Sequence, residues 1–542
     1  MKFRRFYSIL TVSAMAASLL GGCGVQGASV SSTTKAQAAA ATTAAGKTAT
    51  TAAGKTATTA AGKTATTAAA APGSAKKDMV RWLYPGSEQK YHKELTDYVN
   101  SLLDKDNMNI TFQAMPIGWD VWEQKINLMF QAKDEFEFVQ VPEGFGPGYV
   151  QLWNMGASVR LNEMLDKYAP TIKKVVPQWL WQAATIDGNI TTIPAFWTET
   201  ANLKGGICLR KDLYDKYGMT LPTNPDELIA KSVELKKHIT DDGLFDKPTY
   251  MMMRYQEIQT FLHRTYDSYP FTVIDQLLLV RQDGKVESWV DSPEFKKDCE
   301  FYNKCYKSDL VYPDLLSVEV TELTKDFEYG NYLFSEWNTL NSDPFMRKNA
   351  GDDTINNVYI VFNPEKHIMR DQGVRNSNIV SSTSPNPEAA VRFHEWMYAN
   401  KDAYYAVQFG KEGLTYKVEN DQVDFIPDEP NLGLADWMVA NINIQPKYVG
   451  SNPEWNRLTM TEEMNADNSV TIGFAFNSEP VTTEYANCLS EVKNVIYPLR
   501  AGVVSYADGH DNASSALKAA GIDKVVAEYQ TQLTAWLKTR QQ

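Results

Sequence analysis

Cysteine and histidine are scarce in this chain, which has five cysteines and six histidines in 542 residues. The four cysteines of the main body, Cys208, Cys299, Cys305 and Cys488, form no CxxC pair, and the histidines form no cluster. The sequence therefore predicts no metal site and no metal cofactor. Cys299 and Cys305 are six residues apart in a segment with helical character, which puts them on different faces of a helix. We expect scattered buried thiols.

Basic residues are also too few in the body to form a nucleic-acid-binding surface. All nine charged residues up to Lys77 are basic, whereas the chain from Asp78 onward has 44 basic and 66 acidic residues. Nucleic-acid binding depends on a basic surface, so we expect no nucleic-acid partner. Beyond the N-terminal segment, no stretch is long and apolar enough to span a membrane.

The N-terminus has the pattern of a secretory signal. Lys2, Arg4 and Arg5 precede a short apolar stretch that ends in Leu20-Gly21-Gly22-Cys23. This ending resembles a bacterial lipobox. The resemblance implies a signal peptide over 1–22, acyl chains such as palmitate on Cys23, and a protein anchored to the extracellular face of the cell membrane. A plain secretory signal with an incidental cysteine is the alternative.

Residues 23–77 consist almost wholly of Ala, Thr, Gly, Ser and Lys. A unit Ala-Ala-Gly-Lys-Thr-Ala-Thr-Thr recurs there, with glycines at Gly46, Gly54 and Gly62, and the segment contains no aromatic residue. A chain without bulky apolar groups cannot offset the entropy lost on ordering. We predict a flexible linker between the lipid and the body.

The body, residues 78–542, alternates strand and helix signals, which favours an α/β architecture. We expect strands over 79–84, 110–112 and 136–141, and helices over 88–103 and from an Asp120 cap through Met129. The third strand runs into a loop rich in Pro and Gly. Ligands bind beyond the carboxyl ends of strands in open α/β sheets, so this loop is a candidate binding segment.

Three segments in the first half of the body, Leu161–Tyr168, Ile186–Pro194 and Leu209–Thr223, follow the order of helix, "DGkiygiP" turn and "RkDl...G...P.T" segment seen in one family. The chain resembles the extracellular solute-binding lipoproteins of carbohydrate-type ABC importers. The second half resembles a subgroup with a distinctive C-terminal region. The segments that carry this resemblance are Ser384–Ala390, Phe409–Tyr416, Gly473–Ala486 and Leu517–Val525.

The resemblance implies a two-lobe α/β fold of the periplasmic-binding-protein type II, with hinge crossovers and a ligand cleft between the lobes. We expect the first lobe at about 78–200 plus part of 340–400, the second at about 201–335 plus part of 401–475, and a C-terminal region at about 470–542. It also implies a monomeric receptor without enzymatic activity, which passes a solute to membrane permease subunits.

An oligosaccharide is the favoured solute, while a peptide or another polar solute stays open. Sugars present C–H faces and hydroxyls, so a receptor needs aromatic rings beside planar polar groups. Such pairs occur in several expected loops. The candidate ligand-binding residues are Trp119, Glu143, Trp197, Glu199, Glu336, Trp337, Asn338 and Trp437.

Two other classes of function remain open from the residues. A surface glycoside hydrolase needs only two well-placed carboxylates, although the chain has no GxSxG or HExxH motif. A ligand-sensing or adhesion lipoprotein would share the same anchor and the same solute-binding body.

Overall fold

The computed structural model describes residues 76–142, 146–196, 205–258, 260–318, 320–336, 343–370, 374–426, 429–452, 461–462 and 464–540. The predicted signal peptide, Cys23 and nearly all of the predicted linker lie outside these ranges. Among the helices of the described ranges, none combines the length and apolarity needed to cross a membrane.

A five-stranded sheet in the order β2-β1-β3-β14-β6 forms the centre of the first lobe. β1 is parallel to β2 and β3, whereas β14 comes from much later in the chain and is antiparallel to both β3 and β6. The three expected strands are therefore present, because their β-branched and aromatic residues are buried on the sheet. The strands are β1 (Asp78–Pro85), β2 (Ile110–Ile117), β3 (Phe138–Pro142), β6 (Ile193–Pro194) and β14 (Asn376–Val380).

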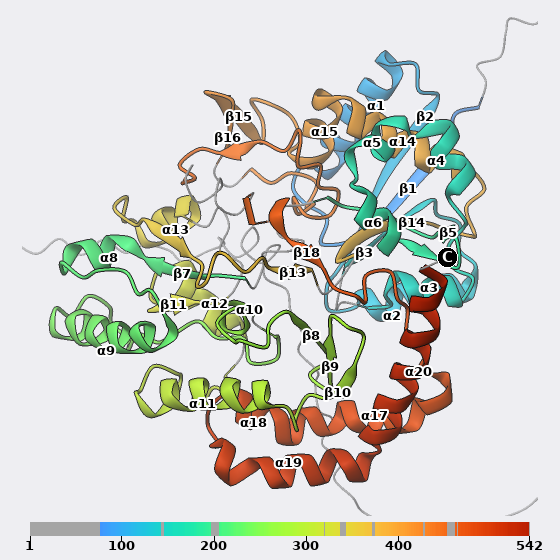
Figure 1. Ribbon diagram of the computed structural model, residues 1–542. Helices are drawn as coiled ribbons and strands as arrows, with labels where there is room; N and C mark the ends of the chain where they lie inside the picture. The colour runs from blue at the N-terminus through green and yellow to red at the C-terminus, as the bar shows by residue number, and fades with distance from the viewer. Residues whose placement is uncertain are drawn as a thin grey trace, which may run out of the picture. The chain divides into compact units, whose positions relative to one another are not determined.

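Helices cover this sheet, and Figure 1 shows α1 and α14 beside β1 and β2. The helices are α1 (His92–Lys105), α2 (Trp122–Ala132), α3 (Tyr149–Asn154), α4 (Asn162–Tyr168), α5 (Pro170–Val175), α6 (Gln178–Ala183), α14 (Pro387–Ala399) and α15 (Lys401–Gln408). Short strands flank them: β4 (Thr185–Ile186), β5 (Asn189–Ile190), β15 (Tyr416–Glu419), β16 (Gln422–Phe425) and β17 (Lys447–Tyr448).

Two expected helix starts were wrong. α1 begins at His92 and not at Glu88, because residues before it form a turn in which the His92 N–H donates to the Gln89 carbonyl. Asp120 is not the cap of α2. Val121 takes that position without a side-chain bond, since the preceding turn is closed by the backbone, with the Val121 N–H donating to the Gly118 carbonyl at 3.1 Å.

The second lobe contains two small antiparallel sheets, in the orders β11-β7-β12 and β10-β9-β8. Its strands are β7 (Ile207–Arg210), β8 (Phe271–Ile274), β9 (Leu278–Arg281), β10 (Val286–Ser288), β11 (Phe334–Ser335) and β12 (Asn357–Ile360), with β13 (Met369–Arg370) paired to β18 (Asp467–Asn468). Its helices are α8 (Lys211–Lys216), α9 (Pro225–Asp241), α10 (Thr260–His263), α11 (Pro293–Lys307), α12 (Val320–Glu328) and α13 (Asp343–Ala350).

The C-terminal region is helical and packs on the core of the second lobe. In Figure 1 two of these helices, α18 (Tyr497–Arg500) and α19 (Tyr506–Ala520), lie beside α11. The last helix, α20 (Ile522–Arg540), is docked on that core, since its Val525, Tyr529 and Leu533 are buried there. The elements are η2 (Glu479–Val481), α17 (Thr482–Glu491), the π-helical η3 (Val492–Ile496), α18 (Tyr497–Arg500), α19 (Tyr506–Ala520) and α20 (Ile522–Arg540).

Separate hydrophobic cores define the two lobes. Buried residues from 80–196 and 380–448 form the larger core of the first lobe, while residues from 207–369 and 481–533 form that of the second. The expected second lobe includes part of the range 401–475, yet buried residues of this range up to Tyr448 pack in the core of the first lobe. The chain therefore passes between the cores three times.

The four cysteines that the structure describes are buried, as expected, and none of them forms a disulfide bond within the described residues. All four belong to the core of the second lobe. Cys208 lies on β7, Cys299 and Cys305 on α11, and Cys488 on α17.

Candidate functional site

Four strands of the first sheet, β1, β2, β3 and β6, end at one edge, which we call the crossover edge. β1, β2 and β3 are parallel, and β6 points the same way because both β3 and β6 are antiparallel to β14. The chain leaves β6 for the second lobe from this edge and returns to it at the start of β14. Open α/β sheets bind ligands beyond the carboxyl ends of their strands. The crossover edge is therefore the first place to look for a binding site.

Two tryptophans predicted as ligand-binding residues meet at this edge. Trp119 follows the end of β2 by two residues, and its ring lies 6.2 Å from that of Trp437, with 50° between the ring planes. Both side chains are partly buried against the core of the first lobe. Such rings combine a flat apolar face with a polar N–H, a combination suited to ligands with C–H faces and hydroxyls.

Asp436, the polar neighbour beside which Trp437 became a candidate, was not itself among the predicted ligand-binding residues. Its Oδ2 accepts hydrogen bonds from the Tyr448 hydroxyl at 2.9 Å and from Gln445 Nε2 at 3.2 Å. Its Oδ1 is buried and has no hydrogen-bond donor among the described residues. Burial raises the pKa of Asp436 despite the bond from Tyr448. The only signal in the sequence was the Asp-Trp dipeptide.

Glu336 lies at the end of the β11-β7-β12 sheet where the chain enters the second lobe. Ser335 pairs with Cys208 of β7, and continuing this antiparallel register places Glu336 opposite Ile207. Ile207 is the first residue of β7, the strand that follows the crossing from β6. Its side chain is 1% exposed, and within the described residues neither carboxyl oxygen has a hydrogen-bond donor. Burial raises the pKa of Glu336 to about 8, although the Arg500 charge and the Tyr302 hydroxyl oppose this.

The other predicted ligand-binding residues lie outside the described residues. In the sequence, Glu143 directly follows Pro142 of β3, and Trp197 comes three residues after Pro194 of β6. The residues concerned are Glu143, Trp197, Glu199, Trp337 and Asn338.

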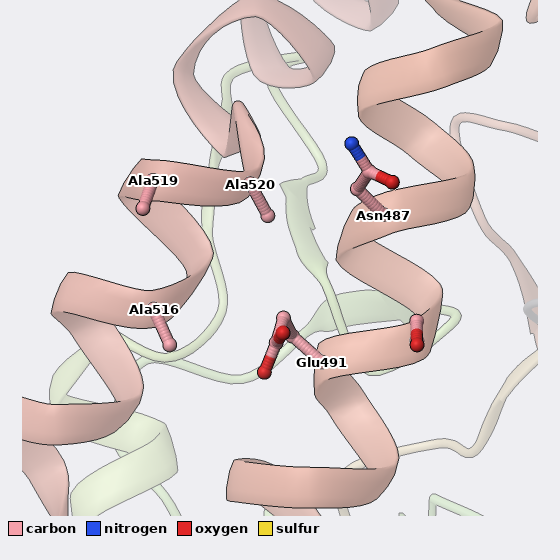
Figure 2. Close-up of a pocket in the computed structure, with 6 residues that line it drawn as sticks. Asn487, Glu491, Ala516, Ala519 and Ala520 are labelled. Carbon is pink, nitrogen blue, oxygen red and sulfur yellow. The ribbon is translucent and has the colours of Figure 1, made fainter.

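A separate recess of ≈ 340 Å³ lies in the C-terminal region between α17 and α19. Figure 2 shows Glu491 between the two helices, with Ala516 and Ala520 directed toward the same space. The six lining residues include no aromatic ring, which a sugar would need as a stacking surface. We therefore assign the candidate site to the crossover edge. The recess is lined by Asn487, Ser490, Glu491, Ala516, Ala519 and Ala520.

Comparison with known families divides the chain into two matched parts. Residues 85–404 match the family described as bacterial extracellular solute-binding protein, and residues 470–538 match a domain of unknown function (DUF3502). The chain is similar to the fructooligosaccharide ABC transporter substrate-binding protein FusA of Streptococcus pneumoniae serotype 4, at 20% identity over 334 residues. That match covers 58% of this chain and 56% of the relative, little more than half of its length.

Solved structures share the fold over most of the chain. The N-glycan transport solute binding protein NgtS from Streptococcus pneumoniae gives a TM-score of 0.71 at 17% identity, covering 86% of this chain and 100% of that chain. An HMO binding ABC-transporter associated solute binding protein from Bifidobacterium longum infantis gives 0.61 at 16% identity, covering 85% and 99%. These neighbours confirm the expected two-lobe α/β fold.

Proposed function

Because the chain belongs to the bacterial extracellular solute-binding protein family, we propose that it captures an oligosaccharide outside the cell and delivers it to an ABC importer. The names of its relatives support a sugar as the solute, since they include a fructooligosaccharide-binding and an N-glycan transport protein. Binding would favour a closed arrangement of the two lobes, which the permease subunits would then recognise.

The pair of tryptophans at the crossover edge is the observation that carries this proposal. Trp119 and Trp437 supply aromatic faces at the place where this class of sheet binds ligands. Glu336 would supply a carboxyl group from the second lobe. We further propose that the ligand also contacts the loop residues that follow β3, β6 and β11, namely Glu143, Trp197, Glu199, Trp337 and Asn338.

Thermal unfolding of the purified protein tests the choice of solute. A ligand that binds only the folded state stabilises it by about 2.7 kcal/mol when present at 100 times its Kd. Fructooligosaccharides and mannose-containing glycans should therefore raise the unfolding temperature, whereas peptides of equal size should not. The sugar should be recovered intact. Recovery of cleaved sugar would instead indicate a glycoside hydrolase. A rise in unfolding temperature with peptides alone would refute an oligosaccharide as the solute.

We also propose that the mature protein is a monomer held on the extracellular face of the cell membrane by acyl chains on Cys23, with residues 23–77 as a flexible linker. Replacement of Cys23 by serine should abolish incorporation of a palmitate analogue. Because the signal peptide would then not be removed, the protein should accumulate as the longer, uncleaved precursor. The measurement is metabolic labelling with in-gel detection. Labelling that persists in Cys23→Ser would contradict the anchor.

A further inference from the structure

Helix α13 is fixed to the second lobe at its first residue. Asp343 is buried, and its carboxylate accepts two hydrogen bonds from Asn357 of β12, one from the backbone N–H at 3.1 Å and one from Nδ2 at 2.7 Å. The Asn357 side chain in turn accepts a bond from the Tyr332 hydroxyl at 2.6 Å. A buried polar network whose members are satisfied holds a single arrangement. The position of α13 is therefore set by the β11-β7-β12 sheet.

Arg347 lies one helical turn after Asp343 and extends this network. Its Nε donates to the Ile355 carbonyl at 2.7 Å, and its Nη2 lies 3.6 Å from Asp343 Oδ2. The third nitrogen, Nη1, donates to the Gly450 carbonyl at 2.9 Å. A guanidinium is planar and holds its donors in fixed directions. The two contacts within the second lobe thus aim the third donor at Gly450.

Gly450 belongs to a turn that begins in the first lobe. Tyr448 is buried in the core of that lobe, and its carbonyl accepts a hydrogen bond from the Ser451 N–H at 3.0 Å. Gly450 has φ +82°, which favours glycine, and Pro344 Cγ would lie 3.5 Å from a Cβ at this position. The rings of Phe345 and Tyr448 lie 6.5 Å apart. Through this turn, α13 of the second lobe contacts the first lobe.

Tyr448 joins the turn to the candidate binding site. Its hydroxyl donates to Asp436 Oδ2 at 2.9 Å, and Gln445 Nε2 donates to the same oxygen at 3.2 Å. Asp436 directly precedes Trp437, whose ring lies 6.2 Å from that of Trp119. Energetic coupling between distant groups is carried by such series of hydrogen bonds and packed side chains. The series from α13 to the two tryptophans is continuous.

We propose that Arg347 is a positioning residue for Trp437, through which the second lobe sets the affinity of the tryptophan pair for the solute. This inference rests on the proposed function, because it takes Trp119 and Trp437 as the rings that contact the oligosaccharide. In this role Arg347 needs no contact with the solute. Its bond to Gly450 ties the loop that carries Trp437 to the position of α13, so the relative arrangement of the lobes and the geometry of the site change together.

The test compares Arg347→Met and Arg347→Lys in the wild-type and the Trp437→Ala backgrounds. Binding of a fructooligosaccharide and of a mannose-containing glycan is measured by calorimetric titration. Arg347→Met should weaken binding about 10-fold. Arg347→Lys should weaken it less, because an ammonium group can still donate to the Gly450 carbonyl. In the Trp437→Ala background, Arg347→Met should cause no further loss, since the ring that Arg347 positions is already absent.

Arg281→Met is the matched control. The side chain of Arg281 is 23% exposed, against 24% for Arg347, and its ion-pair partners Glu287 and Glu294 both lie in the second lobe. This variant should lower the unfolding temperature and leave the Kd for both sugars unchanged.

A wild-type Kd in Arg347→Met would overturn the proposal, because Arg347 would then serve stability alone. An equal loss of affinity in the two backgrounds would also overturn it, since Arg347 would then not act through Trp437. If Arg347→Met does not fold, the exposed Phe345→Ala, which removes the ring contact with Tyr448, is judged by the same criteria. A wild-type protein that binds neither sugar would instead refute the proposed function, and this inference with it.

Discussion

Replacing Trp119 with alanine should weaken oligosaccharide binding by about 10- to 100-fold, and replacing Trp437 should have a similar effect. The two rings lie 6.2 Å apart at the crossover edge and offer flat apolar faces to a sugar ring. Truncation removes one face and exposes the other to water. Calorimetric titration of each folded variant measures the loss as a change in Kd.

The double variant should lose less affinity than the sum of the two single changes, because residues in contact are not energetically independent. Trp536→Ala is the matched control. That ring packs 5.5 Å from Phe474 in the C-terminal region, so its loss should lower the unfolding temperature and leave the Kd unchanged. Wild-type affinity in both single variants at the crossover edge would refute the placement of the sugar there.

The contribution of Glu336 to the free energy of unfolding should fall as the pH rises from about 4.5 to about 8. In this window the folded protein keeps the proton on the buried carboxyl, whereas the unfolded chain has released it. The unfolded state then binds fewer protons, so stability declines, by about 1.4 kcal/mol per pH unit at most. Glu336→Gln should remove this decline and be more stable than wild type near pH 8.

Urea unfolding of wild type and Glu336→Gln at each pH gives the difference between their free energies of unfolding. The difference between the two proteins is needed because buried His394 also changes the stability with pH. Burial lowers the pKa of His394 to about 3, so its contribution to the free energy of unfolding rises between about pH 3 and 6.5. Glu412→Gln, at an exposed position, is the control and should follow the wild-type profile. Parallel profiles for wild type and Glu336→Gln would show that Glu336 is not held neutral in the folded state.

The first sheet could be predicted in part because local patterns determine its strands. The β-forming residues over 79–84 and 110–112 and the alternation over 136–141 are visible in the sequence, and strands form at all three places. The place of β14 between β3 and β6 could not be predicted, since its pairing joins residues far apart in the chain. It could also not be predicted that buried residues between 403 and 448 pack in the core of the first lobe, because they too lie far along the chain from its first strands.

The candidate site shows the same limit. Trp119 and Trp437 could each be selected as an aromatic residue beside polar neighbours, but their contact depends on the fold. Glu336 was selected for its position after a strand, and its burial was not foreseen. The buried ion pair of Arg500 with Asp298 could not be predicted either, because it joins residues 202 positions apart and no local pattern indicates such a pair.

The positions of the cysteines allow local opening of the protein to be measured without an added label. All four described thiols are buried in the second lobe and form no disulfide bond there, so a thiol reagent can react with them only after that lobe opens. The described part of the first lobe contains no cysteine, so its opening would not contribute to the reaction with the reagent. The rate of modification, measured with and without sugar, would report the local stability of one lobe alone, and Cys488 on α17 would separate detachment of the C-terminal helices from unfolding of the sheets beneath them.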